Sequence, residues 1–265
     1  MSGAPELPLG IPFGSSPSFT ELIGHARPEA LPALLTDAPF PVPHGTTVLG
    51  LKFDGGMLMA GDRRATAGNL IADAKMRKVF PADDYSAIAI AGVAGQAIEM
   101  VKLFQLELEH YEKITGDRLS LEGKANRLAQ MIRGNFPLAM QGLIVVPLFG
   151  GYDHRRNEGR IFYYDATGGR WEEDDYQATG SGSQPAKNSL KKRWMAGLTR
   201  DDALRVAAEA LIDAAEDDSA TGGPDVARGI WPVMVIVTAE GATDVAEADV
   251  SAAVEAVIAA RRDAS

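Results

Sequence analysis

The residues with the clearest chemical potential stand at His44-Gly45-Thr46-Thr47-Val48. A threonine hydroxyl is a poor nucleophile unless a nearby base takes its proton. If the bond before Thr46 is cut, the new α-amine can be that base, because its ordinary pKa of about 7.7–8.0 lies close to neutral pH. Gly45 suits the position before the cut, since glycine has no side chain to obstruct attack on its carbonyl. The motif predicts an N-terminal threonine nucleophile, although a short Gly-Thr-Thr string also fits the start of an ordinary strand.

The composition of the chain changes at this same motif. Residues 1–45 hold nine of the 15 prolines and no lysine. Proline fixes φ and removes a backbone donor, so no central sheet or long helix is expected there. A disordered linker would have the same composition. Together with the Gly-Thr bond, the boundary predicts a propeptide, 1–45, that is removed autocatalytically, and a catalytic domain, 46–265.

The catalytic domain must supply the elements that position the chemistry. The first predicted strands, Thr47–Phe53 and Gly56–Ala60, flank the hairpin signal Asp54-Gly55. Further strands are predicted at Ser86–Ala91, Leu143–Phe149, Arg160–Tyr164 and Val233–Val237. Helical spacing marks 97–116, 121–136, a stretch from Ala186 after a glycine-rich turn at 179–183, a stretch opened by Thr199, and 250–261. This order is not a strict βαβ alternation, and it favours two packed, largely antiparallel sheets covered by helices.

Composition excludes several classes of function. The chain has no cysteine, which rules out disulfides, thiolate metal sites and a cysteine nucleophile. Its four histidines lack metal-ligand spacing, and its net charge of −10 argues against a nucleic-acid partner. No apolar run could span a membrane and no secretory signal is visible, so the predicted location is cytoplasmic. The acidic cluster Glu172–Asp175 is interpreted as a solvated loop.

Six strings in order carry a family resemblance, and they are Gly45–Thr47, Ala60–Thr66, Lys75–Phe80, Ala91–Gly95, Gly180–Gly182 and Asp217–Gly223. From Gly45 to about Asp225 the chain resembles the proteasome β-subunit family. The long proline-rich leader and the Ser219–Asp225 segment are most similar to actinobacterial members. The resemblance implies an α+β fold, a four-layer αββα sandwich of the N-terminal nucleophile hydrolase type. It also implies a threonine endopeptidase of a 20S core particle that degrades unfolded proteins, with no cofactor and no metal.

The resemblance assigns roles to individual residues. Thr46 would supply the attacking Oγ and, once freed, the α-amine that acts as base. Lys78 would place a positive charge beside Oγ, and Asp62 would hold that lysine, because a buried ammonium needs a partner. The backbone N–H of Gly92 would donate to the oxyanion. The hydrogen-bond cluster around the amine would comprise Ser181, Asp218 and Thr221.

Each of these residues also has an ordinary structural interpretation when it is taken alone. Asp62 could belong to a turn, Lys78 could be a charge at a strand edge, and Gly92 could end a strand. Ser181 could cap a helix, and Asp218 could end one. Family members often have serine at the position of Thr221, and the hydroxyl is kept here.

Substrate recognition follows from the same resemblance. Thr66 and the segment 92–94 would pair with an extended substrate backbone, as in β-augmentation. The first specificity pocket would be lined by Ala65, Met76, Ile90, Ala94 and Ile98. These side chains are apolar, so a chymotrypsin-like preference for large apolar residues is predicted.

The same resemblance implies the partners. They are other β subunits in a homo-oligomeric ring of about seven members, α-subunit rings, a ring ATPase acting through the α ring, and polypeptide substrates. Three alternatives remain open at this point. A simpler two-ring bacterial protease shares the Thr-Thr start, but it is usually shorter than 46–265 and generally lacks such a leader. A small-molecule amidohydrolase would be expected to have a polar pocket. A non-catalytic α-type subunit would lack the processed threonine and the Asp–Lys pair.

Overall fold

The structure is a computed structural model in which residues 45–263 are described. All of them belong to the second of the two units into which the chain divides, 41–265. The predicted propeptide therefore lies, except for Gly45, outside the described residues. Within 45–263 no helix is long and apolar enough to cross a bilayer.

Two five-stranded sheets form the centre of the domain. The first has the strand order β10-β1-β2-β11-β12, with β1 at Thr47–Phe53, β2 at Gly56–Gly61, β10 at Tyr176–Gly180, β11 at Val233–Thr238 and β12 at Gly241–Asp244. The second has the order β5-β6-β7-β8-β9, with β5 at Val79–Asp83, β6 at Ser86–Gly92, β7 at Val145–Asp153, β8 at Glu158–Tyr164 and β9 at Arg170–Glu173. Neighbouring strands are antiparallel throughout both sheets. A separate hairpin pairs β3 (Ala65–Ala67) with β4 (Leu70–Asp73).

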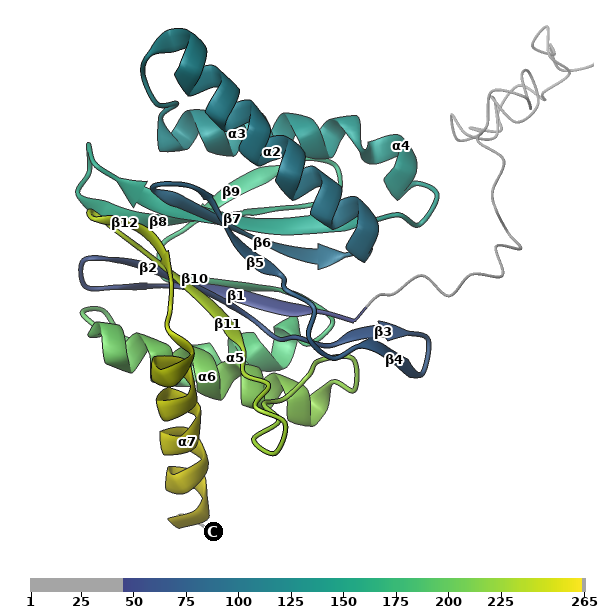
Figure 1. Cartoon of the computed structure of the whole chain (residues 1–265), viewed down its shortest axis with the longest axis vertical. Coiled ribbons are helices and arrows are strands. Elements are labelled where there is room, and N and C mark those ends of the chain that lie inside the picture. Colours follow the sequence, from purple (N-terminus) through teal and green to yellow (C-terminus); the bar gives the residue numbers. More distant parts are fainter. Residues whose placement is uncertain (1–44, 264–265) are drawn as a thin grey trace, which may run out of the picture. The chain divides into compact units, whose positions relative to one another are not determined.

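Helices cover the outer face of each sheet (Figure 1). The second sheet is covered by α2 (Ala94–Thr115) and α3 (Leu121–Gly134), and the short α4 (Phe136–Ala139) lies beside α3. The first sheet is covered by α5 (Ser183–Arg193) and α6 (Arg200–Asp217), and α7 (Glu247–Asp263) packs against α6. The predicted four-layer αββα sandwich is confirmed.

The alternation of side chains along a strand explains the layers. In β6, Ala87, Ala89 and Ala91 belong to the core between the two sheets. Ile88 and Ile90 point the other way and pack in the core beneath α2 and α3. Because both faces of this strand are buried, its sequence is continuously apolar rather than alternating with polar residues.

Most predicted elements are confirmed, with shifted ends. The helix predicted to open at Thr199 is α6, and the Thr199 hydroxyl accepts the Asp202 N–H at 3.2 Å. The glycine-rich turn is shorter than predicted, because β10 runs through Gly180 and α5 begins at Ser183. Strands β4, β5, β9, β10 and β12 and the short helix α4 were not predicted.

The interpretation of the acidic cluster as a solvated loop is wrong for its first two residues. Glu172 and Glu173 belong to β9. The carboxylate of Glu172 lies 2.5 Å from the guanidinium of Arg160 in β8, which is buried. One member of the acidic cluster therefore helps to neutralise a buried cation.

Candidate active site

Thr46 is held at the start of β1 by the end of the neighbouring strand. β1 pairs with β10 in the register Thr47 to Gly180, and the Thr46 carbonyl accepts the Ser181 N–H at 2.9 Å. Gly180 has φ of +103°, and a Cβ there would lie 2.0 Å from the Thr46 carbonyl oxygen. Only glycine lets the two strands approach so closely with this backbone conformation.

The carbonyl of Gly45 lies between a hydroxyl and an ammonium group. Thr46 Oγ1 donates to the Gly45 oxygen at 2.5 Å, and Lys78 Nζ donates to it at 3.3 Å. A Cβ on Gly45 would lie 2.5 Å from Thr66 Oγ1 and 2.7 Å from the carbonyl oxygen of Ala220. In this arrangement the site has room only for glycine before Thr46, beside the hydroxyl expected to attack it.

Lys78 and Asp62 form a buried ion pair. Asp62 follows β2, Lys78 precedes β5, and Lys78 Nζ lies 2.7 Å from Asp62 Oδ1. Asp62 also accepts backbone N–H groups of Thr47, Arg64 and Gly222, each at 2.8 Å. Burial lowers the pKa of the Lys78 ammonium below its ordinary value, and the charge of Asp62 opposes that shift. The carboxylate, with four donors, is therefore the group that favours the charged form of Lys78.

The predicted cluster around the threonine nitrogen is brought together. Ser181 Oγ and Thr221 Oγ1 both donate to Asp218 Oδ2, at 2.5 and 2.6 Å. The backbone N–H of Thr46 donates to Ser181 Oγ at 3.4 Å. Burial raises the pKa of the Asp218 carboxyl, but hydrogen bonds from Ser181 and Thr221 outweigh burial and hold the pKa below its ordinary value. Asp218 is thus ionised at neutral pH.

Gly92 is the last residue of β6. Its φ is +116°, and a Cβ would lie 2.1 Å from the carbonyl oxygen of Ile144. The backbone therefore requires glycine there. Within 45–263 the hydrogen bonds to the Gly45 oxygen come from Thr46 and Lys78, so the oxyanion role of the Gly92 N–H stays a prediction.

The predicted pocket residues fall into two groups. Ile90 is 2% exposed in the core beneath α2, and Ile98 of α2 packs against the same cluster. Ala65 is buried in β3, whereas Met76 and Ala94 are half-buried and have surface that a ligand could cover. The pocket stays a prediction, with Ile90 at most its floor.

Sequence analysis missed one polar residue of this site, Thr47. Its Oγ1 lies 2.6 Å from Thr221 Oγ1 and accepts the Gly182 N–H at 3.0 Å. The only signal in the sequence is the threonine doublet itself. Because successive strand residues point to opposite faces, a second hydroxyl would not be expected to serve the same site.

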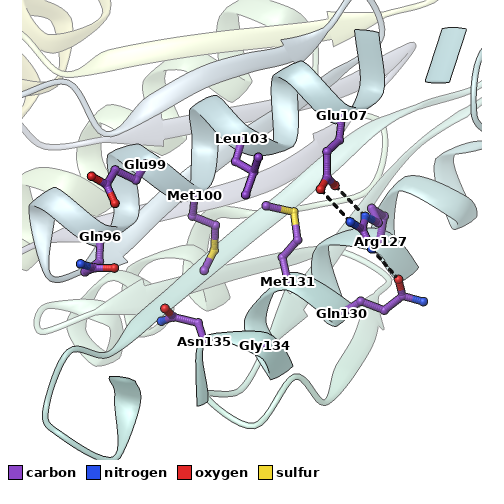
Figure 2. A pocket seen from close by; sticks show the side chains of 10 residues that line it. All are labelled: Gln96, Glu99, Met100, Leu103, Glu107, Arg127, Gln130, Met131, Gly134 and Asn135. Carbon is purple, nitrogen blue, oxygen red and sulfur yellow. Dashed lines mark hydrogen bonds and ion pairs between the residues drawn. The ribbon is translucent and has the colours of Figure 1, made fainter. Parts of the chain in front are cut away.

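A separate groove of about 340 Å³ lies between α2 and α3, away from these residues. Figure 2 shows Arg127 of α3 reaching Glu107 of α2 and Gln130. None of the predicted site residues lines it. In the part of the chain from 45 to 263, no group of three or more histidine or acidic side chains could hold a metal ion.

The domain has two stacked antiparallel sheets between helical layers. A threonine at the start of a central strand lies beside a buried Asp–Lys pair. This fold and site define the class of the N-terminal nucleophile hydrolases. Residues 42–227 match the family model described as proteasome subunit, and the chain belongs to that family. It is 57% identical over 239 residues to the proteasome subunit beta of Streptomyces griseus subsp. griseus, covering 89% of this chain and 85% of that protein. The chain is therefore a threonine endopeptidase of the proteasome type. Membership of this family also implies assembly with other proteasome subunits.

Proposed function

We propose that the chain is a precursor that cleaves itself between Gly45 and Thr46 and then hydrolyses polypeptides with Thr46 as its N-terminal nucleophile. One observation carries the proposal: the Gly45 carbonyl oxygen accepts hydrogen bonds from both Thr46 Oγ1 and Lys78 Nζ. The hydroxyl is therefore adjacent to the bond to be cut, and a positive charge lies where negative charge would develop.

Self-cleavage then follows from these contacts. Thr46 Oγ1 attacks the Gly45 carbonyl carbon as a water molecule takes its proton. The Thr46 nitrogen takes up a proton when the C–N bond breaks, so that the acyl group moves from nitrogen to oxygen. Water hydrolyses the resulting ester. The products are a carboxylate on Gly45 and a free α-amine on Thr46, and residues 1–45 are released as the propeptide.

The freed amine is the base in peptide hydrolysis. It takes the proton of Thr46 Oγ1 as that oxygen attacks the substrate carbonyl, and it returns the proton to the leaving amine when the peptide bond breaks. Water then hydrolyses the acyl-enzyme. Lys78, held by Asp62, favours the alkoxide-like oxygen, and the N–H of Gly92 stabilises the oxyanion. Ser181, Asp218 and Thr221 orient the amine.

We also propose a chymotrypsin-like preference for large apolar residues before the cut. The candidate pocket residues Ala65, Met76, Ile90, Ala94 and Ile98 bear no charge. Burying a charged substrate side chain among them would be costly, whereas an apolar one would gain about 1.5–3 kcal/mol on full burial. Thr66 lies beside Gly45, which supports a role for β3 in binding the backbone of an extended peptide.

For the assembly we propose a homo-oligomeric β ring of about seven members that stacks on α rings and receives substrates from a ring ATPase in the cytoplasm. The outer helical layer supports extensive contacts with other chains. Large apolar side chains are exposed on α2, on α4 and beside it, and they include Leu103, Leu106, Ile114, Phe136 and Met140. Such a surface is unusual for a monomer.

The proposal is tested by substituting the nucleophile in the full-length chain, assembled with α subunits. Thr46→Ala removes the hydroxyl and should abolish both self-cleavage and hydrolysis of a fluorogenic peptide. Thr46→Ser keeps a hydroxyl and should retain measurable activity in both assays. Self-cleavage of the Thr46→Ala chain in the absence of other proteases would show that Thr46 is not the nucleophile.

A further inference from the structure

Thr47 contacts both Asp62 of the Asp62–Lys78 pair and Thr221 of the cluster around Asp218, although no role was predicted for it. We propose that Thr47 is a positioning residue: its hydroxyl donates to Thr221 and so strengthens the hydrogen bond from Thr221 to Asp218, the carboxylate that orients the Thr46 amine through Ser181. The proposal rests on the proposed function of Thr46. It concerns the residue after the nucleophile, which does not touch the bond being cut.

Thr47 is completely buried at the start of β1. Its backbone N–H donates to Asp62 Oδ1 at 2.8 Å, which ties it to the Asp62–Lys78 pair. Its hydroxyl contacts Thr221 Oγ1 at 2.6 Å and the Gly182 N–H at 3.0 Å, which ties it to the cluster around Asp218. One residue therefore connects the two charged groups of the site.

The direction of each hydrogen bond follows from counting protons. An ionised carboxylate only accepts, so the single hydroxyl proton of Thr221 goes to Asp218 at 2.6 Å. Thr221 Oγ1 must then accept in its contact with Thr47, and Thr47 is the donor. The Thr47 oxygen in turn accepts the Gly182 N–H. The chain of donors runs from Gly182 through Thr47 and Thr221 to Asp218.

Asp218 also determines the hydrogen bond at the Thr46 nitrogen. The Ser181 hydroxyl gives its proton to the same oxygen of Asp218 at 2.5 Å, so Ser181 Oγ faces the Thr46 nitrogen as an acceptor. After cleavage the amine would donate one N–H to Ser181 and keep its lone pair for the proton of Thr46 Oγ1. Hydrogen bonds in a chain polarise one another, so loss of the Thr47 donor weakens the bond from Thr221 to Asp218.

Gly182 provides independent support. Its φ of −88° is open to any residue, so backbone conformation does not require glycine. A Cβ at this position would lie 2.5 Å from Thr47 Oγ1 and 2.6 Å from Thr221 Oγ1. Glycine at 182 therefore leaves room for the contact between these two hydroxyls.

The test compares Thr47→Val, which keeps the shape and removes the hydroxyl, with Thr47→Ser, which keeps the hydroxyl. Full-length chains are assembled with α subunits, and kcat and KM for a fluorogenic peptide are measured across pH. Thr47→Val should lower kcat about tenfold, change KM by less than about twofold, and move the acid limb of the profile to higher pH, because Asp218 loses stabilisation of its charge. Lys78, the charged side chain whose field acts on Asp218, is unchanged in both variants. Thr47→Ser should stay within about threefold of the parent chain.

A parent-like kcat and pH profile in Thr47→Val, or an equal loss in Thr47→Ser, would overturn the role of Thr47. If Thr47→Val fails to assemble because Thr221 loses its buried partner, the double variant with Thr221→Val is compared with Thr221→Val alone. Because Thr47 acts through Thr221, the two should have the same lowered kcat. A parent-like kcat in Thr221→Val, or a lower kcat in the double variant than in Thr221→Val, would equally overturn the role of Thr47. Thr46→Ala is measured in parallel. Activity in that variant would show that Thr46 is not the nucleophile and would overturn this proposal as well. If Thr46→Ala is inactive, the Thr47 variants alone decide the role of Thr47.

Discussion

Lys78 Nζ lies 2.7 Å from Asp62 Oδ1, and both side chains are fully enclosed by protein. Removing two charges from water costs more than their attraction returns unless further hydrogen bonds compensate. Three backbone N–H groups supply that compensation at Asp62. The pair is therefore a costly feature that the fold maintains directly beside the Gly45 carbonyl.

Replacing Lys78 by alanine should abolish self-cleavage and peptide hydrolysis while the fold is retained. Loss of one such electrostatic group lowers kcat by about 10²-fold or more. Lys124→Ala is a matched control, because Lys124 is also buried and paired, with Asp83 at 2.5 Å, but lies outside the candidate site. Turnover of assembled Lys78→Ala within about threefold of the Lys124→Ala control would remove Lys78 from the mechanism.

The buried lysine also predicts the alkaline behaviour of the enzyme. Burial lowers the pKa of Lys78 below its ordinary value of 10.5, so its positive charge is lost as pH rises through that lowered pKa. Activity should therefore decline on the alkaline side below pH 10.5. Asp62→Asn removes the charge that opposes the shift, and should move this limb to lower pH and reduce kcat at neutral pH about tenfold or more. An alkaline limb that does not move would mean that Lys78 does not titrate there.

Specificity is best tested at Met76, because a glutamate at the buried Ile90 would also destabilise the core. Met76→Glu places a carboxylate in the candidate pocket, and should raise the ratio of kcat/KM for arginine over leucine before the cut about tenfold. Met76→Gln has the same length without the charge and should not. The unmodified enzyme should prefer leucine, tyrosine or phenylalanine, and faster cleavage after arginine would show that the pocket assignment is mistaken.

Stability should depend on Arg160, because its side chain connects β8 to one helix and two other strands. Its buried guanidinium pairs with Glu122 of α3, Asp153 of β7 and Glu172 of β9. Arg160→Met would leave Asp153 without its cation, whereas Glu122 would keep Arg170 and Glu172 would keep Arg156. The variant should lower the free energy of unfolding by about 2 kcal/mol, less than for a fully buried pair because Glu122 and Glu172 are partly exposed. Urea denaturation of the isolated chain measures this, with Arg155→Met on the exposed turn as the control. Equal midpoints for the two variants would contradict it.

The sequence predicted the parts of the molecule that depend on local pattern. The hairpin around Asp54-Gly55 and the helix opened by Thr199 were found because turn and cap residues act on their immediate neighbours. Local pattern could not show that Glu172 meets Arg160, because that contact depends on how β8 and β9 pair. Thr47 was missed for the same reason: its partners Gly182 and Thr221 are far away in the sequence.

Self-cleavage between Gly45 and Thr46 is tested by the N-terminal residue of the β chain in the assembled particle, which intact mass and Edman sequencing identify. The full-length chain, 1–265, is assembled with α subunits in the absence of other proteases. The mature chain should begin at Thr46, and the Thr46→Ala chain should remain uncut. An active particle whose chains begin at any other residue, or remain uncut, would contradict it.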